Sequence, residues 1–180
     1  MSSQRVIIIS GSPGSGKSSV SRKLAEMSTH DMSVHMHTDD FYKYICKGHI
    51  EPWLLEAEAQ NTVVIEAFAT SVAKFAMGGY EVIVDGVIGP WFVEPWTRLV
   101  RDGFDVRYVI LRADEHTTIY RATKRDKPTD LTDGNVVTEM WRAFCELGEY
   151  ESHVIDTTNL SLEETIVEVR TKLKGDGMRI

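Results

Sequence analysis

The sequence has no apolar run that approaches 18 residues, and it has only two cysteines. Its Met1–Gln4 start leads directly into a strand-like segment, without the small-residue cleavage site of a signal peptide. We therefore expect no membrane-spanning helix, no membrane partner and a cytoplasmic location. Cys46 and Cys145 form neither a CxxC pair nor a disulfide framework for a chain of this length, so we expect two buried thiols.

Positive charge is also scarce, because 20 Lys and Arg residues face 27 Asp and Glu residues and give a formal net charge of −7. This balance argues against a broad phosphate-backbone footprint, so no nucleic-acid partner is expected, although a local basic pocket remains compatible with it. Repeats, low-complexity tracts and linkers are absent. A second core would leave each half of 180 residues too small, so residues 1–180 are expected to form one domain.

Short apolar runs alternate with helical patterns along the whole chain. Strands are expected at Val6–Ile9, Val34–Thr38, Val82–Val84, Val106–Leu111 and Val154–Ile155. Helical spacing of apolar residues is found from Val20 to Met27, Ile65 to Phe75, Val137 to Leu147 and Leu162 to Leu173. The strands are too continuously apolar to leave one face in water, which favours a parallel sheet covered by helices on both sides.

A complete GxxxxGK[ST] motif follows the first expected strand and precedes the first expected helix. Its residues are Gly11, Ser12, Pro13, Gly14, Ser15, Gly16, Lys17 and Ser18, and the adjoining Ser19 is expected to join them in nucleotide binding. Glycines let backbone N–H groups approach phosphate oxygens, and the helix directs its positive end at the anion. Lys17 is expected to reach the β- and γ-phosphates, and Ser18 to hold Mg²⁺.

Two further strand ends carry carboxylates. Asp39 and Asp40 follow the second expected strand, and Asp85 follows the Val82–Val84 run. Open parallel sheets bind their ligands at the carboxyl ends of the strands, so Asp39 is placed to act as a base and Asp85 to lie near the metal or the acceptor. The alternatives are a helix N-cap for the Asp pair and a plain strand-end turn for Asp85.

The segment His37–Tyr42, read together with the phosphate-loop motif, resembles the P-loop small-molecule kinases. This group includes uridine and nicotinamide riboside kinases, gluconate and shikimate kinases, and chloramphenicol phosphotransferase. The resemblance implies an α/β, three-layer P-loop NTPase fold with a five-stranded parallel sheet in the order 2-3-1-4-5. It also implies ATP and Mg²⁺ as cofactors, transfer of the γ-phosphate to a hydroxyl of a small molecule, and Asp39 as the base. The glycine-rich triplet of shikimate kinases and the Gly-Asp-x-Leu-His pattern of gluconate kinases are absent.

The same resemblance assigns a small lid to about residues 113–135. There, Arg121 and Arg125 lie four residues apart on one helical face and are expected to fold over the phosphates as catalytic residues, unless they form a solvated basic stripe. Thr157 lies where such kinases pass backbone beneath the adenine. Substrate-lining positions are expected at Asp39, Asp40, Tyr42, Trp53 and Trp91, with core packing as the alternative for Trp91.

Other functions remain open at this stage. An ATP-binding regulatory module would need no acceptor base, and a polynucleotide end-kinase is disfavoured by the acidic charge. A GTPase is disfavoured because Thr123–Asp126, which matches [NT]KxD, lies in a helical pattern, and no DxxG sequence is present. His35 and His37 share one face of the second strand, but they lack a clear third ligand, so strand packing is favoured over a zinc site.

Overall fold

Five parallel strands in the order β2-β3-β1-β4-β5 form the central sheet, which confirms the expected strand order. The computed structural model describes residues 4–124 and 133–180. The strands are β1 (Arg5–Ser10), β2 (Ser33–His37), β3 (Glu81–Gly86), β4 (Asp105–Arg112) and β5 (Val154–Asp156). Because β1 lies at the centre of the sheet, the loop that follows it has neighbours from the other strands on both sides.

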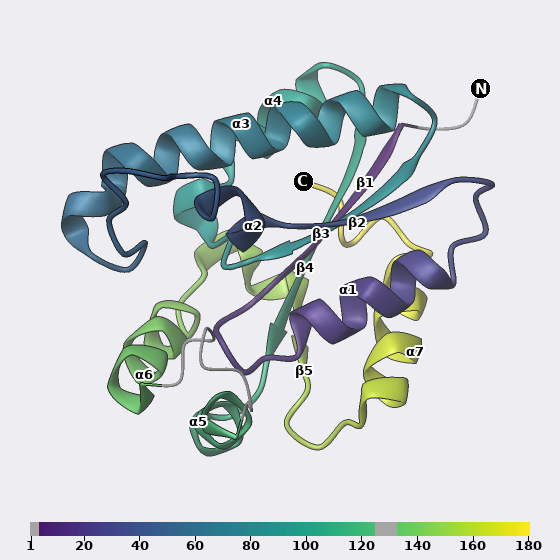
Figure 1. Ribbon diagram of the computed structural model, residues 1–180. Coiled ribbons are helices and arrows are strands. Elements are labelled where there is room, and N and C mark those ends of the chain that lie inside the picture. The colour runs from purple at the N-terminus through teal and green to yellow at the C-terminus, as the bar shows by residue number, and fades with distance from the viewer. Residues whose placement is uncertain (1–3, 125–132) are drawn as a thin grey trace.

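Helices cover both faces of the sheet. They are α1 (Lys17–Glu26), α2 (Thr38–Tyr42), α3 (Glu58–Met77), α4 (Glu94–Arg101), α5 (Glu115–Thr123), α6 (Gly134–Ala143) and α7 (Leu162–Lys172). Short 3₁₀ turns lie at Leu55–Ala57, Pro90–Phe92 and Gly148–His153. Figure 1 shows α3 and α4 over one face, and α1 and α7 over the other. Within the described ranges, no helix has the length and apolarity needed to cross a membrane.

The alternation of side chains along the strands divides the core into two layers. Val6 and Ile8 of β1 pack with Phe68 of α3 and Trp96 of α4, whereas Ile7 and Ile9 pack against α1 and α7 on the other face. Both sets are buried. This is why the central strands show continuous apolar runs in the sequence, with no polar face.

Several expectations about local structure were wrong. The second strand ends at His37, and Thr38 begins helix α2, so the Asp pair lies in a helical first turn. Helix α6 ends at Ala143, before the last two apolar residues of the pattern assigned to it. Cys46 is exposed where burial was expected.

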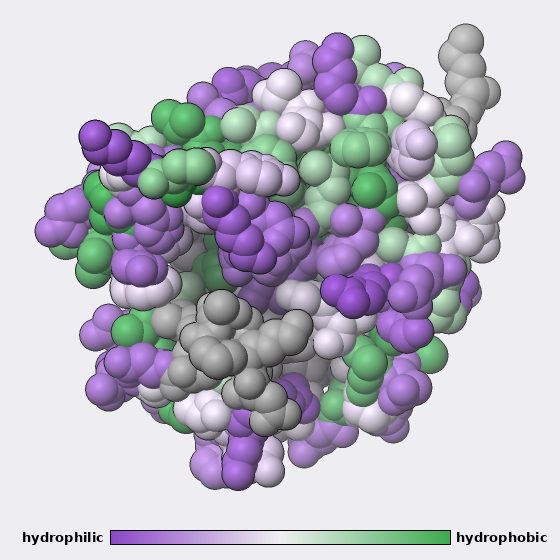
Figure 2. All heavy atoms as spheres, viewed as in Figure 1, coloured by the Kyte–Doolittle hydropathy of each residue, from purple (hydrophilic) through white to green (hydrophobic). Residues whose placement is uncertain are grey.

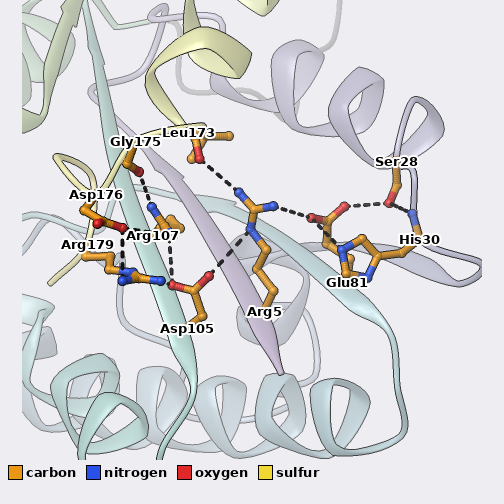
Figure 3. A network of polar contacts seen from close by, with 10 residues as sticks. All are labelled: Arg5, Ser28, His30, Glu81, Asp105, Arg107, Leu173, Gly175, Asp176 and Arg179. Carbon is orange, nitrogen blue, oxygen red and sulfur yellow. Dashed lines mark hydrogen bonds and ion pairs between the residues drawn. The ribbon is translucent and has the colours of Figure 1, made fainter. Parts of the chain in front are cut away.

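The chain after α7 returns to the sheet and lies beside the first half of β4. Arg179 and Arg107 form an antiparallel bridge, and the Tyr108 N–H donates to the Met178 carbonyl oxygen at 2.8 Å. Figure 3 shows the polar contacts that hold this tail: Asp105 accepts from Arg107 Nε at 2.8 Å and from Arg179 Nε at 3.0 Å. These contacts therefore hold the tail at the end of the sheet where the parallel strands begin.

The Asp105 carboxylate is expected to stabilise the fold in a pH-dependent way. Burial raises the pKa of Asp105, but hydrogen bonds from Arg107 and Arg179 outweigh this and hold it below the ordinary value. We expect Asp105→Asn to lower the free energy of unfolding by about 2 kcal/mol at pH 7. A depressed carboxyl pKa stabilises the folded state above the unfolded pKa of about 4, and this stabilisation is lost as pH falls below it.

Urea unfolding at pH 7 and at acidic pH measures this contribution. The difference between wild type and Asp105→Asn should shrink on acidification, whereas Asp102→Asn, at an exposed carboxylate near the end of α4, should differ little from wild type at either pH. A constant difference at both pH values would show that the substitution acts through packing and not through charge.

Candidate active site

A glycine-rich loop joins β1 to α1 at the carboxyl end of the sheet. Gly14 in this loop has φ of +87°, and a Cβ added there would lie 2.3 Å from the carbonyl oxygen of Thr118. Any side chain at residue 14 would therefore be strained and would collide with the backbone of α5. Helix α5, the first helix of the expected lid segment, thus packs directly against the expected phosphate-binding loop.

The amino end of α1 is directed at the same loop. Gly16 is its N-cap, and no side chain caps the helix there, so its first-turn N–H groups can donate to an anion. Lys17 is buried, and its Nζ donates to the Ser12 carbonyl oxygen at 3.3 Å. Of the other loop residues, Gly11, Pro13 and Ser15 are buried and Ser18 and Ser19 are exposed. The loop has the backbone donors and the ammonium group that a triphosphate requires.

Ser18 and Asp85 meet at the base of this loop. The Ser18 hydroxyl donates to Asp85 Oδ2 at 2.5 Å, and the Asp85 side chain is 0% exposed at the end of β3. A hydroxyl and a carboxylate are oxygen ligands of the kind that Mg²⁺ prefers, and phosphates and water usually supply the rest of its shell. In the described part of the chain, no three His, Cys, Asp or Glu side chains are grouped to hold a metal ion. The pair fits a Mg²⁺ site that depends largely on a bound nucleotide.

Two histidines of β2 contact the same carboxylate. His35 Nε2 contacts Asp85 Oδ1, and His37 Nδ1 lies 2.8 Å from Asp85 Oδ2. The other ring nitrogen of His37, Nε2, lies 3.1 Å from Asp39 Oδ2. Sequence reasoning placed both histidines on one strand face but missed their common partner. The signal was their two-residue spacing on a strand that runs beside β3, where His37 pairs with Asp85.

His37 and each of the two carboxylates of this cluster, Asp39 and Asp85, favour the charged form of the other. Burial lowers the pKa of His37, but hydrogen bonds to Asp39 and Asp85 outweigh burial and raise it to about 10. Burial raises the pKa of Asp85, yet hydrogen bonds from His35 and His37 bring it well below the ordinary value. The pKa of Asp39 is likewise raised by burial but lowered overall by His37 and by the charge of Lys17. At neutral pH an imidazolium therefore lies between two carboxylates.

The expected acceptor side begins at α2. The Asp39 side chain is 61% exposed, and Asp40 forms an exposed ion pair with Lys43 at 2.7 Å. The Tyr42 hydroxyl donates to Asn61 Oδ1 of α3 at 3.0 Å, and burial raises the pKa of Tyr42 to about 12. Asp39 thus has an open side, while Tyr42 joins the end of α2 to α3.

The two tryptophans expected to line the acceptor site are both exposed. Trp91 meets Phe144 edge to face, with ring centroids 5.5 Å apart, and within residues 4–124 and 133–180 neither tryptophan forms a hydrogen bond or ring contact with the Asp39–Asp85 cluster. Figure 2 shows apolar spheres at the end of the molecule where the chain between α2 and α3 protrudes. The exposed apolar side chains of that segment are Tyr44, Trp53, Leu54 and Leu55.

The first expected lid arginine contacts the loop after β5. Arg121 Nη2 donates to the carbonyl oxygens of Thr157 at 3.2 Å and Leu160 at 3.5 Å. Thr157 is buried, and its hydroxyl has no hydrogen-bond partner in the described part of the molecule. The second lid arginine, Arg125, lies outside the described residues. The structure therefore joins one lid residue to the segment expected beneath adenine.

Comparison with known proteins assigns this chain to a family. Residues 7–142 match the AAA domain family. A comparison with curated proteins found no match. Among solved structures, a gluconokinase from Sinorhizobium meliloti 1021 is 16% identical with a TM-score of 0.66, and the match covers 95% of this chain and 92% of that chain.

Two other solved structures share the fold. The Mycobacterium tuberculosis APS kinase CysC, in complex with AMPPNP and APS, is 17% identical with a TM-score of 0.66, covering 96% of this chain and 99% of that chain. A chain of the Pnkp1/Rnl/Hen1 RNA repair complex is 17% identical with a TM-score of 0.62, covering 98% of this chain and 47% of that one. The match over residues 7–142, together with the glycine-rich loop and the sheet order, shows that this chain belongs to the AAA domain family and has the P-loop NTPase fold.

Proposed function

We propose that the protein is an ATP-dependent phosphotransferase that moves the γ-phosphate of ATP to a hydroxyl of a small molecule. The observation that carries this proposal is the position of Asp39. Its carboxylate is linked through His37 to Asp85, which accepts from Ser18 of the glycine-rich loop. A carboxylate that is next to a phosphate-binding loop and still 61% exposed can serve a hydroxyl that arrives from solvent.

The loop and the amino end of α1 bind the triphosphate in this proposal. Backbone N–H groups of residues 14–18 surround the β-phosphate, and the Lys17 ammonium group meets the β- and γ-phosphates. Ser18 would hold Mg²⁺ directly, with Asp85 hydrogen-bonded beside it. When bound, the metal would offset negative charge on the β- and γ-phosphate oxygens. Thr157 would lie against the adenine.

In the transfer step, the acceptor hydroxyl oxygen forms a bond to the γ-phosphorus. The bond from that phosphorus to the oxygen bridging it to the β-phosphate breaks, and ADP leaves with the electron pair. The proton of the hydroxyl passes to Asp39. Arg121, from α5, and Arg125 would offset charge on the transferring phosphoryl group as the lid closes. The acceptor itself would be held by Asp40, Tyr42, Trp53 and Trp91.

Two features of the comparisons bear on this choice. A gluconokinase and an APS kinase share the fold along nearly the whole of both chains, which supports phosphoryl transfer to a small molecule. The chain of the RNA repair complex keeps a polynucleotide 5′-hydroxyl as a second candidate acceptor. The net charge of −7 favours the small molecule, because a nucleic-acid strand requires basic side chains along its path.

Binding of Mg·ATP is the first test. At a nucleotide concentration of 100 times Kd, the stabilisation is about 2.7 kcal/mol, which for a domain of this size raises Tm by roughly 5–10 °C. We expect Mg·ATP to produce such a shift and Mg·GTP a smaller one. A thermal unfolding series with both nucleotides measures it, with Mg²⁺ alone as the control. A Tm that ATP leaves unchanged would remove the basis of the proposal.

The acceptor is then sought by an ATP-consumption screen. Nucleosides, sugars, hydroxyl-bearing metabolites and hydroxylated antibiotics represent the small-molecule class, and an oligonucleotide with a 5′-hydroxyl represents the polynucleotide class. ATP binding without turnover on any of them, or with water, would favour a nucleotide-binding regulatory module over a kinase.

A further inference from the structure

His37 is the residue that connects the expected base to the expected metal side of the site. It is the last residue of β2 and the N-cap of α2, and its two ring nitrogens contact carboxylates from two different elements. Nδ1 lies 2.8 Å from Asp85 Oδ2, and Nε2 lies 3.1 Å from Asp39 Oδ2. Only a protonated imidazole ring can donate from both nitrogens, and each of the two carboxylate contacts limits the ring orientation that the other requires.

The inner end of this chain of contacts is rigid. Asp85 is 0% exposed, and its oxygens also contact Ser18 and His35. The backbone around His37 has little freedom as well, because a Cβ added to Gly86 would lie 2.1 Å from Thr38 Oγ1. The start of α2 thus packs closely against the end of β3. His37 receives its orientation from buried groups that are already satisfied.

The outer end has few other supports. Asp39 lies on a helix of five residues, and its side chain is 61% exposed. Besides His37, the Thr38 hydroxyl donates to Oδ1 at 3.3 Å, and the positive charge of Lys17 acts on the carboxylate. Without His37, the Asp39 carboxylate would lose its hydrogen bond at Oδ2 and would sample other rotamers more readily. With His37 in place, Oδ2 is engaged and Oδ1 keeps a lone pair for an acceptor hydroxyl.

We propose that His37 is a positioning residue that holds the Asp39 carboxylate in register with Asp85 and the phosphate-binding loop, so that Oδ1 faces the incoming hydroxyl. This inference rests on the proposed phosphotransfer. The role of His35 differs from that of His37, because the contact of its ring is with Asp85 and does not involve Asp39. His37 therefore contacts both Asp39 and Asp85, whereas the contact of His35 within this cluster is with Asp85.

Two substitutions divide the contacts of His37. In His37→Asn, the amide nitrogen takes the place of Nδ1 and keeps a donor to Asp85 while the donor to Asp39 is lost. In His37→Gln, the longer side chain brings its amide nitrogen to the place of Nε2 and keeps the donor to Asp39. His35→Asn is the matched control, since it removes a donor from Asp85 and leaves the His37–Asp39 contact in place.

The experiment measures kcat and KM for ATP in these three variants and in Asp39→Asn with and without His37→Asn. The assay is transfer to an identified acceptor, or ATP hydrolysis with water as the acceptor. We expect His37→Asn to lower kcat by about 10-fold to 10²-fold with the KM for ATP nearly unchanged, and His37→Gln to keep most of the activity. In the Asp39→Asn background, His37→Asn should add no further loss, because no base remains to be positioned. Thermal unfolding with and without Mg·ATP checks that each variant folds and binds.

Three results would overturn this proposal while the proposed function stands: a wild-type kcat in His37→Asn, equal losses in His37→Asn and His35→Asn, or full additivity with Asp39→Asn. A wild-type protein that binds Mg·ATP but transfers phosphate to no acceptor and to no water would overturn the phosphotransferase assignment, and the role of His37 with it.

Discussion

Replacing Asp39 by Asn is expected to lower kcat by about 10²-fold to 10⁴-fold, the usual contribution of a general base, while Mg·ATP binding stays nearly intact. Asn has almost the same shape, and its amide oxygen can still accept from His37, but it cannot take a proton as a carboxylate does. Phosphoryl transfer is mostly positioning and charge stabilisation, so some activity should remain. Steady-state kinetics with an identified acceptor measure the loss, and the Tm shift with Mg·ATP measures binding.

The neighbouring carboxylate tests the assignment within the same helix. Asp40 is exposed and paired with Lys43, so it has no link to the Asp85 cluster through the described contacts. If Asp40→Asn lost transfer while Asp39→Asn kept it, the base would be Asp40. If neither substitution reduced transfer, the acceptor site would lie elsewhere in the protein. Asp102→Asn, at the opposite edge of the sheet, is the control for removal of an exposed carboxylate.

Replacing Lys17 by Ala is expected to damage binding and transfer together, because the ammonium group meets the β- and γ-phosphates in the ground state and in the transition state. We expect kcat to fall by about 10²-fold to 10³-fold, as for loss of one preorganised donor, and the Tm shift with Mg·ATP to shrink sharply. The pattern differs from that of Asp39→Asn, in which the Tm shift survives.

Because Lys17 is buried, its replacement by Ala can also disturb packing, and two further variants control for this. Lys17→Met keeps much of the side-chain volume without the charge, so it separates loss of charge from a packing defect. Lys23→Ala is the matched control on α1, because Lys23 is exposed and paired with Glu26 at 2.7 Å. A Lys17→Met variant with a normal Tm shift and normal turnover would contradict the phosphate-binding role of this residue.

The sequence allowed the sheet and the phosphate loop to be predicted because both depend on local signals. Apolar runs mark the strands, the glycine spacing marks the loop, and the resemblance to P-loop kinases supplied the strand order that the structure confirms. Asp39 and Asp85 could be placed near each other because the carboxyl ends of parallel strands lie at the same end of the sheet. Their roles in catalysis and metal binding remain predictions.

The contacts within the site could not be predicted in the same way. Whether His37 reaches Asp85 depends on the register between β2 and β3, which are separated by the whole of α3 in the sequence. Periodicity gives the face of a strand, but the partner on the next strand depends on long-range packing. The Arg121 contact with the Thr157 loop has the same origin, since it joins segments 36 positions apart.

The tail beside β4 determines how the protein can be attached to a sensor surface. Arg179 and Met178 are held next to Arg107 and Tyr108, at the edge of the sheet opposite the glycine-rich loop. A tether added after Ile180 would therefore attach the molecule on the side away from the loop. Nucleotides injected over such a surface would reach the loop without passing the tether.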